Sequence, residues 1–405
     1  MNKEVSLNTE AKTNEVSIVL YLILGGLMAF TSLSTDIYLP TMPQMHRDLQ
    51  GDIELTVTGF LIGFSIAQLI WGPISDRIGR KQPLVIGLIL FIIGSICCAL
   101  SQTITQILIC RVVQAFGACV GPMLSRAMVR DMMSRTKAAE MLSTLMILMA
   151  LAPIIGPLLG GQLLKISSWH SIFWLLAVIG AVMLISLVKL PETLPSEKRL
   201  NTSVAESFKK YGILIRNRPF MFYTLCVTFF YVSVYAFVAG SPSVYITYFG
   251  IKEQNYGWLF AVNILGIVSL SFANRKLVRR FSLDTLLKVA TTIGMLAGIA
   301  LAVLVKWDVG GIYGIIFPVF FLFSMNGIIA ACTTAAALDN VPDMAGAASA
   351  LLGSLQYGSG ILSSLLLAWF GDGKGTPWTM SWIIALFAIA SAITIWFHII
   401  IQNKK

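Results

Sequence analysis

The sequence predicts an all-α membrane protein in which twelve transmembrane helices form two bundles of six. Three observations lead to this fold class. The 405-residue chain is 57% hydrophobic and only 12% charged, whereas a soluble domain carries about 25% charged residues. Twelve apolar runs have roughly the 20-residue length that a helix needs to cross a bilayer. The longest hydrophilic stretch, residues 191–219, separates the first six runs from the last six.

The twelve runs follow one another with short connections. The six that we assign to an N-terminal bundle, within residues 17–190, are 17–39, 54–74, 83–101, 104–125, 140–161 and 170–190. The six that we assign to a C-terminal bundle, within residues 220–401, are 220–240, 256–274, 284–305, 311–332, 346–370 and 378–401. We expect cytoplasmic tails at 1–16 and 402–405 and a cytoplasmic linker at 191–219. A membrane β-barrel is excluded because the runs are too long and do not alternate.

The positive charge of the chain is concentrated on one side of this topology. With the N-terminus in the cytoplasm, 22 of the 29 Lys and Arg residues fall on the cytoplasmic side, and Arg111 and Lys288, inside the fourth and ninth runs, are assigned to neither side. The opposite loops hold five: Arg47, Lys165, Lys252, Lys306 and Lys374. Cytoplasmic loops of membrane proteins carry this excess of Lys and Arg. The net charge of +10 therefore indicates that both termini are cytoplasmic, and no nucleic-acid partner is expected.

A short basic segment follows the second run, and we interpret it as a loop between two helices. It combines small, acidic and basic residues: Gly72, Asp76, Arg77, Gly79, Arg80 and Lys81. A second basic segment, 274–280, lies about 200 residues later, after the second run of the other half. Such duplication is typical of secondary transporters, whose substrate site lies between the repeats. The alternative is that a cytoplasmic loop in this position is basic in any case.

Two charged residues near or within the apolar runs are candidates for proton coupling, because charge inside a membrane is costly. Asp36 ends the first run. Burial raises the pKa of a carboxyl group and a nearby cation lowers it, so a site that is alternately wet and closed could bind and release a proton. The alternative is an acid that caps a helix end, which Pro40 and Pro43 favour. Arg111, in the fourth run, keeps its proton and could pair with an anionic group; the alternative is an arginine that reaches the interface. Glu54, before the second run, is expected to be solvated.

The fifth run contains a dense group of small residues and prolines. Small residues let helices approach closely, and proline removes a backbone donor and bends a helix. We predict a kinked seam between the two bundles, although a general packing face is the alternative. The residues are Ala152, Pro153, Gly156, Pro157, Gly160 and Gly161.

Neutral polar and aromatic side chains within the runs are candidates for ligand binding, because an apolar cavity with a few amides suits an amphiphilic ligand. Aromatic residues of the seventh run could equally face lipid. The candidates are Tyr38, Gln68, Gln114, Tyr235, Phe237, Asn263, Asn326, Gln356 and Tyr357. The chain has no nucleotide-binding loop, and its three histidines form no metal or general-base pattern. We therefore predict neither an enzyme nor a cofactor.

These residues together resemble the major facilitator superfamily. Residues 72–81 resemble its loop 2–3 signature, and Arg111 with Gln114 and Gly117 resembles its helix 4 signature. Residues 152–161 resemble the antiporter signature, with Ala152 where that pattern prefers glycine. Three further segments resemble the Bcr/CflA drug-resistance branch: Asp36 to Pro40, Val129-Arg130-Asp131 and Gly346 to Ala350.

The resemblance implies a proton-driven antiporter that works by alternating access. Asp36 would carry the proton and Arg111 would be its electrostatic partner. Asp76 would face the positive N-terminal end of a helix that starts near Ala345. The cations of a cytoplasmic charge lattice with Asp76 and Asp131 would be Arg77, Arg80, Arg126 and Arg130.

The preferred interpretation is a monomer in a bacterial cytoplasmic membrane that exports small amphiphilic compounds or antibiotics in exchange for protons. The main alternative is a dedicated exporter of one metabolite, such as a siderophore, an amino acid or a nucleoside. An importer is disfavoured by the fifth run, and a membrane enzyme by the lack of a paired acid and base or a metal cluster.

Overall fold

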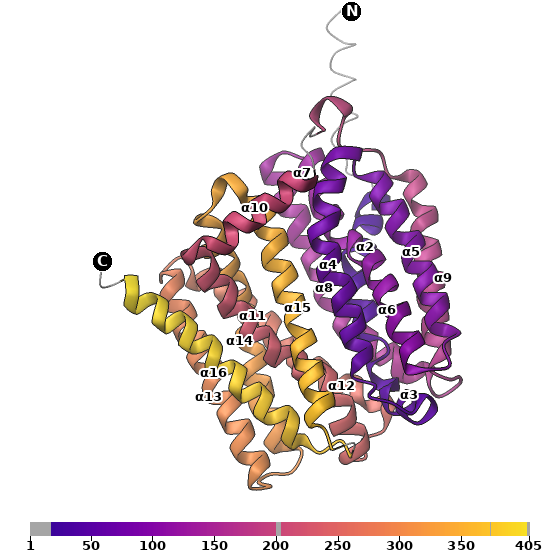
Figure 1. Ribbon diagram of the computed structural model, residues 1–405, viewed down its shortest axis with the longest axis vertical. Coiled ribbons are helices and arrows are strands. Elements are labelled where there is room, and N and C mark those ends of the chain that lie inside the picture. The colour runs from indigo at the N-terminus through magenta and orange to yellow at the C-terminus, as the bar shows by residue number, and fades with distance from the viewer. Residues whose placement is uncertain (1–17, 200–203, 373, 403–405) are drawn as a thin grey trace, which may run out of the picture.

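The computed structural model describes residues 18–199, 204–372 and 374–402, and in these ranges all regular structure is helical (Figure 1). The N-terminal half contains α2 (Ile18–Asp36), η2 (Leu39–Thr41), α3 (Met42–Leu49), α4 (Leu55–Ile78), α5 (Lys81–Ala99), α6 (Ile104–Ala118), α7 (Val120–Met132), α8 (Arg135–Leu163), α9 (His170–Ser186) and η3 (Leu187–Lys189). The linker contains η4 (Ser196–Lys198) and α10 (Val204–Arg216). The C-terminal half contains α11 (Arg218–Pro242), η5 (Ser243–Tyr248), α12 (Glu253–Leu277), α13 (Leu283–Lys306), α14 (Tyr313–Asp339), η6 (Pro342–Met344), α15 (Ala345–Phe370) and α16 (Pro377–Gln402).

Twelve helical stretches in the described ranges are long and apolar enough to cross a membrane, which confirms the predicted fold class. Some of these spans are not single helices. The fourth, Ile104–Met132, is interrupted at Cys119 between α6 and α7. Pro122 lies just beyond this break; proline lacks a backbone donor and its ring clashes with the carbonyl four residues earlier. The first, Val19–Leu49, is interrupted after Asp36 and continues through η2 and α3.

The two halves share most of their helix pairs, although the first helix packs extensively on the sixth only in the C-terminal half, where α11 lies along α16. In each half the first helix packs on the fifth, the second on the fourth, and the third on the fourth and sixth: α2 on α8, α4 on α6 and α5 on α6 and α9, against α11 on α15, α12 on α14 and α13 on α14 and α16. The bundles meet where the second helix of each half packs on the fifth of the other, in the pairs α4–α15 and α8–α12. This correspondence supports the internal repeat that the two basic segments indicate.

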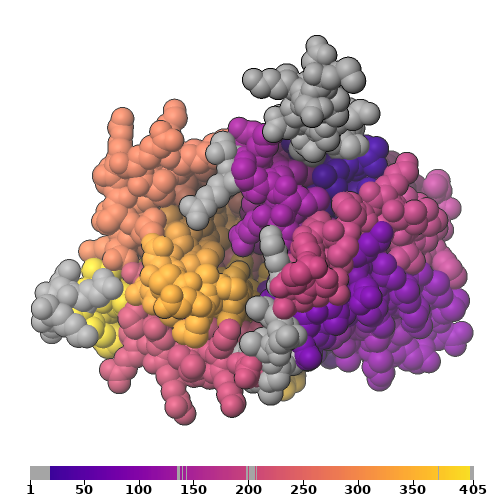
Figure 2. Space-filling view, turned by 90° about the horizontal axis from the view of Figure 1, so that it is seen from above, coloured from indigo at the N-terminus to yellow at the C-terminus, as the bar shows by residue number. Residues whose placement is uncertain are grey.

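We call the end of the molecule that carries Gly79, Ser134 and α10 the linker end, and the end that carries α3 and η5 the opposite end (Figure 1). Seen onto the linker end, the surface is hollowed between the purple end of α8 and the orange helices of the C-terminal bundle (Figure 2). Around the outside, large apolar side chains remain exposed, as on α9, where Ile185 is 71% exposed. An apolar belt of this kind fits a hydrocarbon environment and would be unfavourable in water.

The linker contains a helix that the sequence analysis did not predict. Tyr211 and Leu214 of α10 are buried, and α10 packs against α4, α11 and α15. The hydroxyl of Tyr211 donates a hydrogen bond to the carbonyl oxygen of Leu69, with 3.1 Å between the oxygens. Burial, together with the negative charge of Asp76, raises the pKa of Tyr211. The linker is therefore packed against both bundles.

The predicted seam in the fifth run is only partly a seam between bundles. Gly156 and Gly160 face the end of α2: a Cβ at Gly156 would lie 3.2 Å from the nitrogen of Ile37, and one at Gly160 would collide with the oxygen of Ile37. Gly161 instead faces α12, where a Cβ would lie 2.7 Å from the oxygen of Glu253. Residues four apart share a face of a helix and their neighbours in sequence do not. The prediction was therefore wrong for Gly156 and Gly160, which pack within the N-terminal bundle.

Candidate functional site

Asp36 is the last residue of α2 and is only 7% exposed. The 3-10 turn that follows has Pro40 in its first turn, which stops α2 from continuing past the acid. On the other side lies α8, where a Cβ at Gly156 would be 3.5 Å from the Cβ of Asp36. The glycine face of α8 therefore allows this acidic turn to approach closely, and Asp36 is shielded from solvent although it lies at a helix end.

Arg111 is 1% exposed and is held by oxygen atoms of neighbouring helices. Its Nη1 donates to the carbonyl oxygen of Ser34 at 3.1 Å and to Oε1 of Gln114 at 2.7 Å, and its Nε donates to the oxygen of Thr56 at 3.5 Å. Gln114 in turn donates from Nε2 to Oγ of Ser95 at 2.8 Å. Burying a charge is tolerable only when such partners replace water. These bonds connect α2, α4, α5 and α6 around one guanidinium group.

Three aromatic rings complete the surroundings of Arg111. Its Cζ lies 4.2 Å from the ring centre of Tyr38, 4.5 Å from that of Phe60 and 5.8 Å from that of Phe173. A cation over an aromatic face gains up to about 2 kcal/mol when it is desolvated. The sequence analysis named Tyr38 as a ligand-binding candidate but missed Phe60 and Phe173, because no spacing connects residues from three helices. The structure places Tyr38 beside Arg111.

Asp36 and Arg111 interact electrostatically without forming an ion pair. The positive charge of Arg111 acts on the carboxyl group of Asp36, yet the ion pairs found in the described ranges all belong to Arg80. The charge of Arg111 is stabilised instead by hydrogen bonds to carbonyl and amide oxygens, which do not gain or lose protons at neutral pH. The carboxyl group of Asp36 is thus free to change its charge while the guanidinium group stays in place.

A row of aromatic rings lies where α4, α11 and α15 meet. The ring centres of Phe64 and Tyr357 are 4.4 Å apart, those of Tyr357 and Tyr235 are 6.4 Å apart, and those of Tyr235 and Tyr231 are 6.0 Å apart. The amides of Asn326 and Gln356 lie beside Tyr231. The Oδ1 atom of Asn326 is buried and has no hydrogen-bond partner within the described ranges. Buried acceptors are nearly always paired, so this oxygen is available for a ligand or a water molecule.

The other ligand-binding candidates lie beside this row or in other parts of the molecule. Phe237 packs inside the C-terminal bundle, 4.9 Å from the ring of Phe323. Gln68 contacts α15 at Gly353, next to a hydrogen bond of 2.9 Å from Oγ of Ser354 to the oxygen of Ser65. Asn263 is buried on α12. The structure therefore brings together Tyr235, Tyr357, Gln356 and Asn326, and Gln68 adjoins them because it lies one turn from Phe64 and faces Gly353, one turn from Tyr357. Phe237 and the Arg111 group belong to other clusters.

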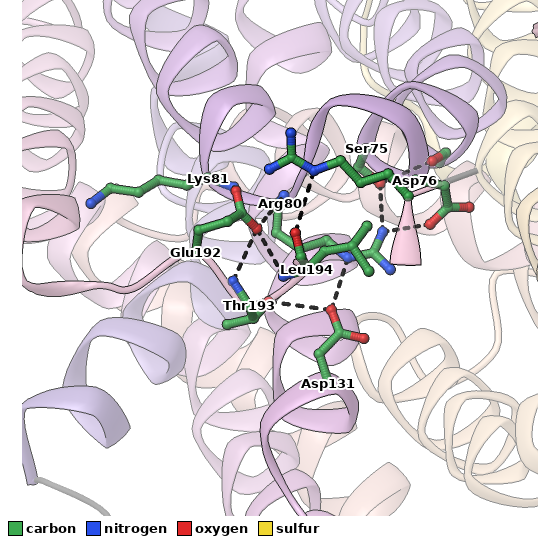
Figure 3. Close-up of polar contacts among 10 residues, drawn as sticks. Ser75, Asp76, Arg80, Lys81, Asp131, Glu192, Thr193 and Leu194 are labelled. Carbon is green, nitrogen blue, oxygen red and sulfur yellow. Dashed lines mark hydrogen bonds and ion pairs between the residues drawn. The ribbon is translucent and has the colours of Figure 1, made fainter. Parts of the chain in front are cut away.

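Arg80 joins three helix ends at the linker end (Figure 3). It forms ion pairs with Asp76 at 2.6 Å and with Asp131 at 3.0 Å, and its Nη1 donates to Oγ of Ser75 at 2.9 Å. The segment that we interpreted as a loop is mostly helical, since α4 continues to Ile78 and α5 starts at Lys81. A turn this short requires Gly79, whose φ of 102° is unfavourable for any residue with a side chain.

Glu192, just after the sixth span, was missed by the sequence analysis. Its carboxylate accepts hydrogen bonds from the backbone nitrogens of Arg80 at 2.9 Å and Lys81 at 3.1 Å (Figure 3). The first backbone donors of a helix have no partner within the helix, so this acid caps α5 from 112 residues away. Burial alone would raise the pKa of Glu192, but the backbone donors outweigh it and hold the pKa below its usual value. Only the sequence Pro191-Glu192-Thr193 after an apolar run could have drawn attention to it.

The predicted charge lattice is smaller than expected. Arg77 and Arg130 are exposed, and Nε of Arg126 donates to the carbonyl oxygen of Pro122 at 2.9 Å. Of the four predicted cations, only Arg80 forms ion pairs in the described ranges. Arg77 and Arg130 extend into solvent, where an ion pair gains little. That Asp76 faces the start of α15 stays a prediction.

Glu54 also departs from its prediction. It is partly buried at the opposite end, and its Oε1 accepts a hydrogen bond from Oγ of Ser243 at 3.2 Å. Ser243 belongs to the C-terminal bundle, so the acid that we expected to be solvated connects the two bundles.

Two six-helix bundles that are related by a repeat and contain buried charged side chains are typical of secondary membrane transporters. This is the class of protein that the fold indicates. A family model described as Major Facilitator Superfamily matches residues 23–364, and the chain belongs to this superfamily.

The comparisons with known proteins agree. The chain is 35% identical over 388 residues to the MFS-type transporter YdgK of Bacillus subtilis (strain 168), covering 94% of this chain and 95% of that protein. It is 28% identical to a bicyclomycin resistance protein homolog of Haemophilus influenzae, covering 87% and 89% of the two chains. It is also 28% identical to multidrug resistance protein D of Escherichia coli (strain K12), covering 93% and 95%.

Solved structures share the fold at much lower identity. A structure of the nucleoside transporter NupG matches with a TM-score of 0.76 and 11% identity, covering 93% of this chain and 99% of that one. A D-xylose-proton symporter matches with a TM-score of 0.75 and 15% identity, covering 94% and 96%. These likenesses concern the fold alone.

Proposed function

We propose that this protein is a proton-coupled antiporter that exports small amphiphilic compounds, antibiotics among them, across the bacterial cytoplasmic membrane. One observation carries the proposal: a buried carboxyl group at the end of α2 lies close to a permanently charged arginine without forming an ion pair with it. The basic turns lie at the linker end, so the positive-inside rule puts that end and both termini in the cytoplasm.

Asp36 is the proton carrier in this mechanism. It lies at the junction of α2 and α8, and α8 is also one of the two helices through which the bundles meet. When the bundles move relative to each other, water reaches Asp36 from one side at a time, and the carboxyl group takes up or releases a proton. Arg111 favours the ionised form through its charge, and its fixed oxygen partners keep it in place in both states.

The ligand contacts the aromatic row and the amides of Asn326 and Gln356. Such a surface of rings with a few hydrogen-bonding groups suits compounds that are partly apolar and partly polar. The relatives named for bicyclomycin resistance and multidrug resistance support a drug-like ligand.

The proposal is tested with purified protein in liposomes. We expect a pH gradient with the acidic side inside the liposomes to drive uptake of an exported dye by the protein molecules that are inserted inside-out. Asp36→Asn should reduce this transport to background, while exchange of ligand across the membrane without a gradient continues. Asp52→Asn, which removes an exposed acid, is the matched control and should transport normally. Full gradient-driven transport by Asp36→Asn would remove Asp36 from the mechanism.

A second measurement separates the drug exporter from a dedicated exporter. Ligand-induced proton release from the purified protein is measured across unrelated dyes, antibiotics and metabolites. A polyspecific pump releases protons with several unrelated compounds, whereas a dedicated exporter responds to one chemical class.

A further inference from the structure

Glu54 lies between the two bundles at the opposite end. It is the residue before α4, and its Oε1 accepts a hydrogen bond from Oγ of Ser243 at 3.2 Å. Ser243 is the first residue of η5, directly after Pro242, which ends α11. The bond therefore connects the beginning of the second span with the end of the seventh, across 189 residues.

The bundles are also in close contact at this end through α8 and α12. A Cβ at Gly161 would lie 2.7 Å from the oxygen of Glu253, and a Cβ at Gly257 would lie 2.8 Å from the nitrogen of Leu158. Small residues let helix backbones approach in this way. The hollowed face lies at the other end of the molecule (Figure 2), so Glu54 belongs to the closed side.

The surroundings of Glu54 favour its protonated form. Burial raises its pKa, and hydrogen bonds and the nearby charge of His46 oppose this increase only in part, while Asp52 adds to it. His46 comes from α3 and Asp52 from the turn before α4. The segment η5 contributes no charged side chain, and the loop with Asp372 and Lys374 packs on the backbone of Ser243 through Gly375.

We propose that Glu54 is a second proton-binding group, which holds the opposite ends of the bundles together while it is protonated and lets them separate when it ionises in water. This inference rests on the alternating access of the proposed function. In the closed state the carboxyl group is partly buried, which favours its protonated form; in the open state it is wetted and ionises more readily. Protonation therefore favours closure, and the closed state loses stability as the pH rises through the pKa of the closed state.

The transport cycle gives this group a specific task. Under the proposed topology the opposite end faces the outside, where protons are abundant when an inward proton gradient drives export. After the ligand has left, a proton from outside neutralises Glu54 and the outer end closes. Proton binding at Asp36 would be linked to release of the ligand, and proton binding at Glu54 would be linked to closure of the outer end.

The distance between the outer ends of the bundles tests this role directly. Nitroxide labels are attached at Ser167→Cys and Lys306→Cys, two exposed positions at the opposite end, after the six native cysteines have been replaced. The distance distribution is measured in nanodiscs between pH 5 and pH 9. We expect the ratio of closed to open molecules to fall with increasing pH, by at most about tenfold per pH unit for one proton.

Glu54→Gln is neutral at every pH, so it should remain closed and lose this pH dependence. Asp52→Asn is the matched control: it should retain the pH dependence, with its midpoint moved to lower pH because the charge of Asp52 no longer raises the pKa of Glu54. An unchanged pH response in Glu54→Gln would overturn the proposal. Should that variant fail to fold, judged by size-exclusion and ligand binding, Glu54→Asp serves instead: its shorter, wetter carboxyl group should move the midpoint to lower pH, and an unmoved midpoint would refute the role.

The measurement needs no transport, so its outcome is independent of the proton carrier. Asp36→Asn should keep the full pH response of the distance. If Asp36→Asn transports normally while Glu54→Gln loses its pH response, Asp36 is not the proton carrier, but the proposed role of Glu54 in closing the outer end still stands.

Discussion

The two bundles share one packing pattern but differ in where they carry charge. The N-terminal bundle buries Asp36 and Arg111. In the described part of the C-terminal bundle the buried polar residues are Ser, Thr and Asn side chains together with His398. Because buried charge is costly, its position usually marks function. The repeat therefore supplies two similar scaffolds; under the proposed function, the N-terminal one would carry the proton chemistry and the C-terminal one a neutral surface for the ligand.

The turns after the second helix of each half differ in the same way. In the first, Arg80 pairs with Asp76 and Asp131. In the second, Arg279 and Arg280 are exposed, and Arg275 lies 5.1 Å from the ring of Phe272. Both turns are basic, as the topology requires. Among the described residues, ion pairs form only at the first turn, whereas Asp284, close to the second, accepts a hydrogen bond from the hydroxyl of Tyr223. We therefore expect only the first turn to influence conformation.

The largest effect should come from removing the buried cation of the N-terminal bundle. Arg111→Met leaves the oxygens of Ser34 and Gln114 without their donor. Each buried oxygen left without a donor costs roughly 1–3 kcal/mol, and the positive charge beside Asp36 is lost as well, so we expect proton-driven transport in liposomes to fall to background.

The matched control is the cation within a span of the other bundle. Lys288 lies 4.2 Å from the ring of Trp396 and is only partly buried, so Lys288→Met should reduce transport by at most about fivefold, in keeping with a largely exposed cation–π contact of roughly 0.5–1 kcal/mol. Equal losses of transport in Arg111→Met and Lys288→Met would contradict the proposal that only the N-terminal bundle carries the proton coupling.

A smaller effect is expected at the two basic turns. Arg80→Gln removes two ion pairs, each of which contributes up to about 1 kcal/mol at a surface. We expect transport to fall about tenfold because the balance between conformations shifts, with ligand affinity measured by calorimetry unchanged. Asp76→Asn should shift the balance in the same direction to a lesser extent.

Arg280→Gln, at the second turn, should leave both transport and affinity unchanged. A loss of ligand affinity in Arg80→Gln, or equal transport defects in Arg80→Gln and Arg280→Gln, would show that the acids around Arg80 do not distinguish the two turns.

Features that repeat along the chain could be predicted from the sequence, and features that depend on distant contacts could not. Hydrophobic length revealed the twelve spans, and the charges of the loops revealed the division into halves. Glu192, in contrast, acts on the backbone of Arg80, more than a hundred residues earlier, and no local pattern predicts such a cap. Phe60 and Phe173 surround Arg111 from two other helices and look like any apolar residue in a span. Gly156 and Gly161 belong to one motif, and only the rotation of α8 decides which bundle each of them faces.

The smallest effect should concern the ligand surface of the C-terminal bundle. Asn326→Ala removes the buried Oδ1 that has no partner in the described ranges, and one hydrogen bond contributes about 0.5–1.5 kcal/mol. We expect the Kd of an exported ligand to rise by a factor of about 2–12, while the number of protons released per ligand stays the same. Asn340→Ala is the control, since the amide of Asn340 is bound to the oxygen of Ala336 on its own helix at 2.7 Å and should not affect affinity. If Asn326→Ala changes the proton release but not the Kd, the C-terminal bundle takes part in proton coupling, and the contrast between the two bundles does not hold.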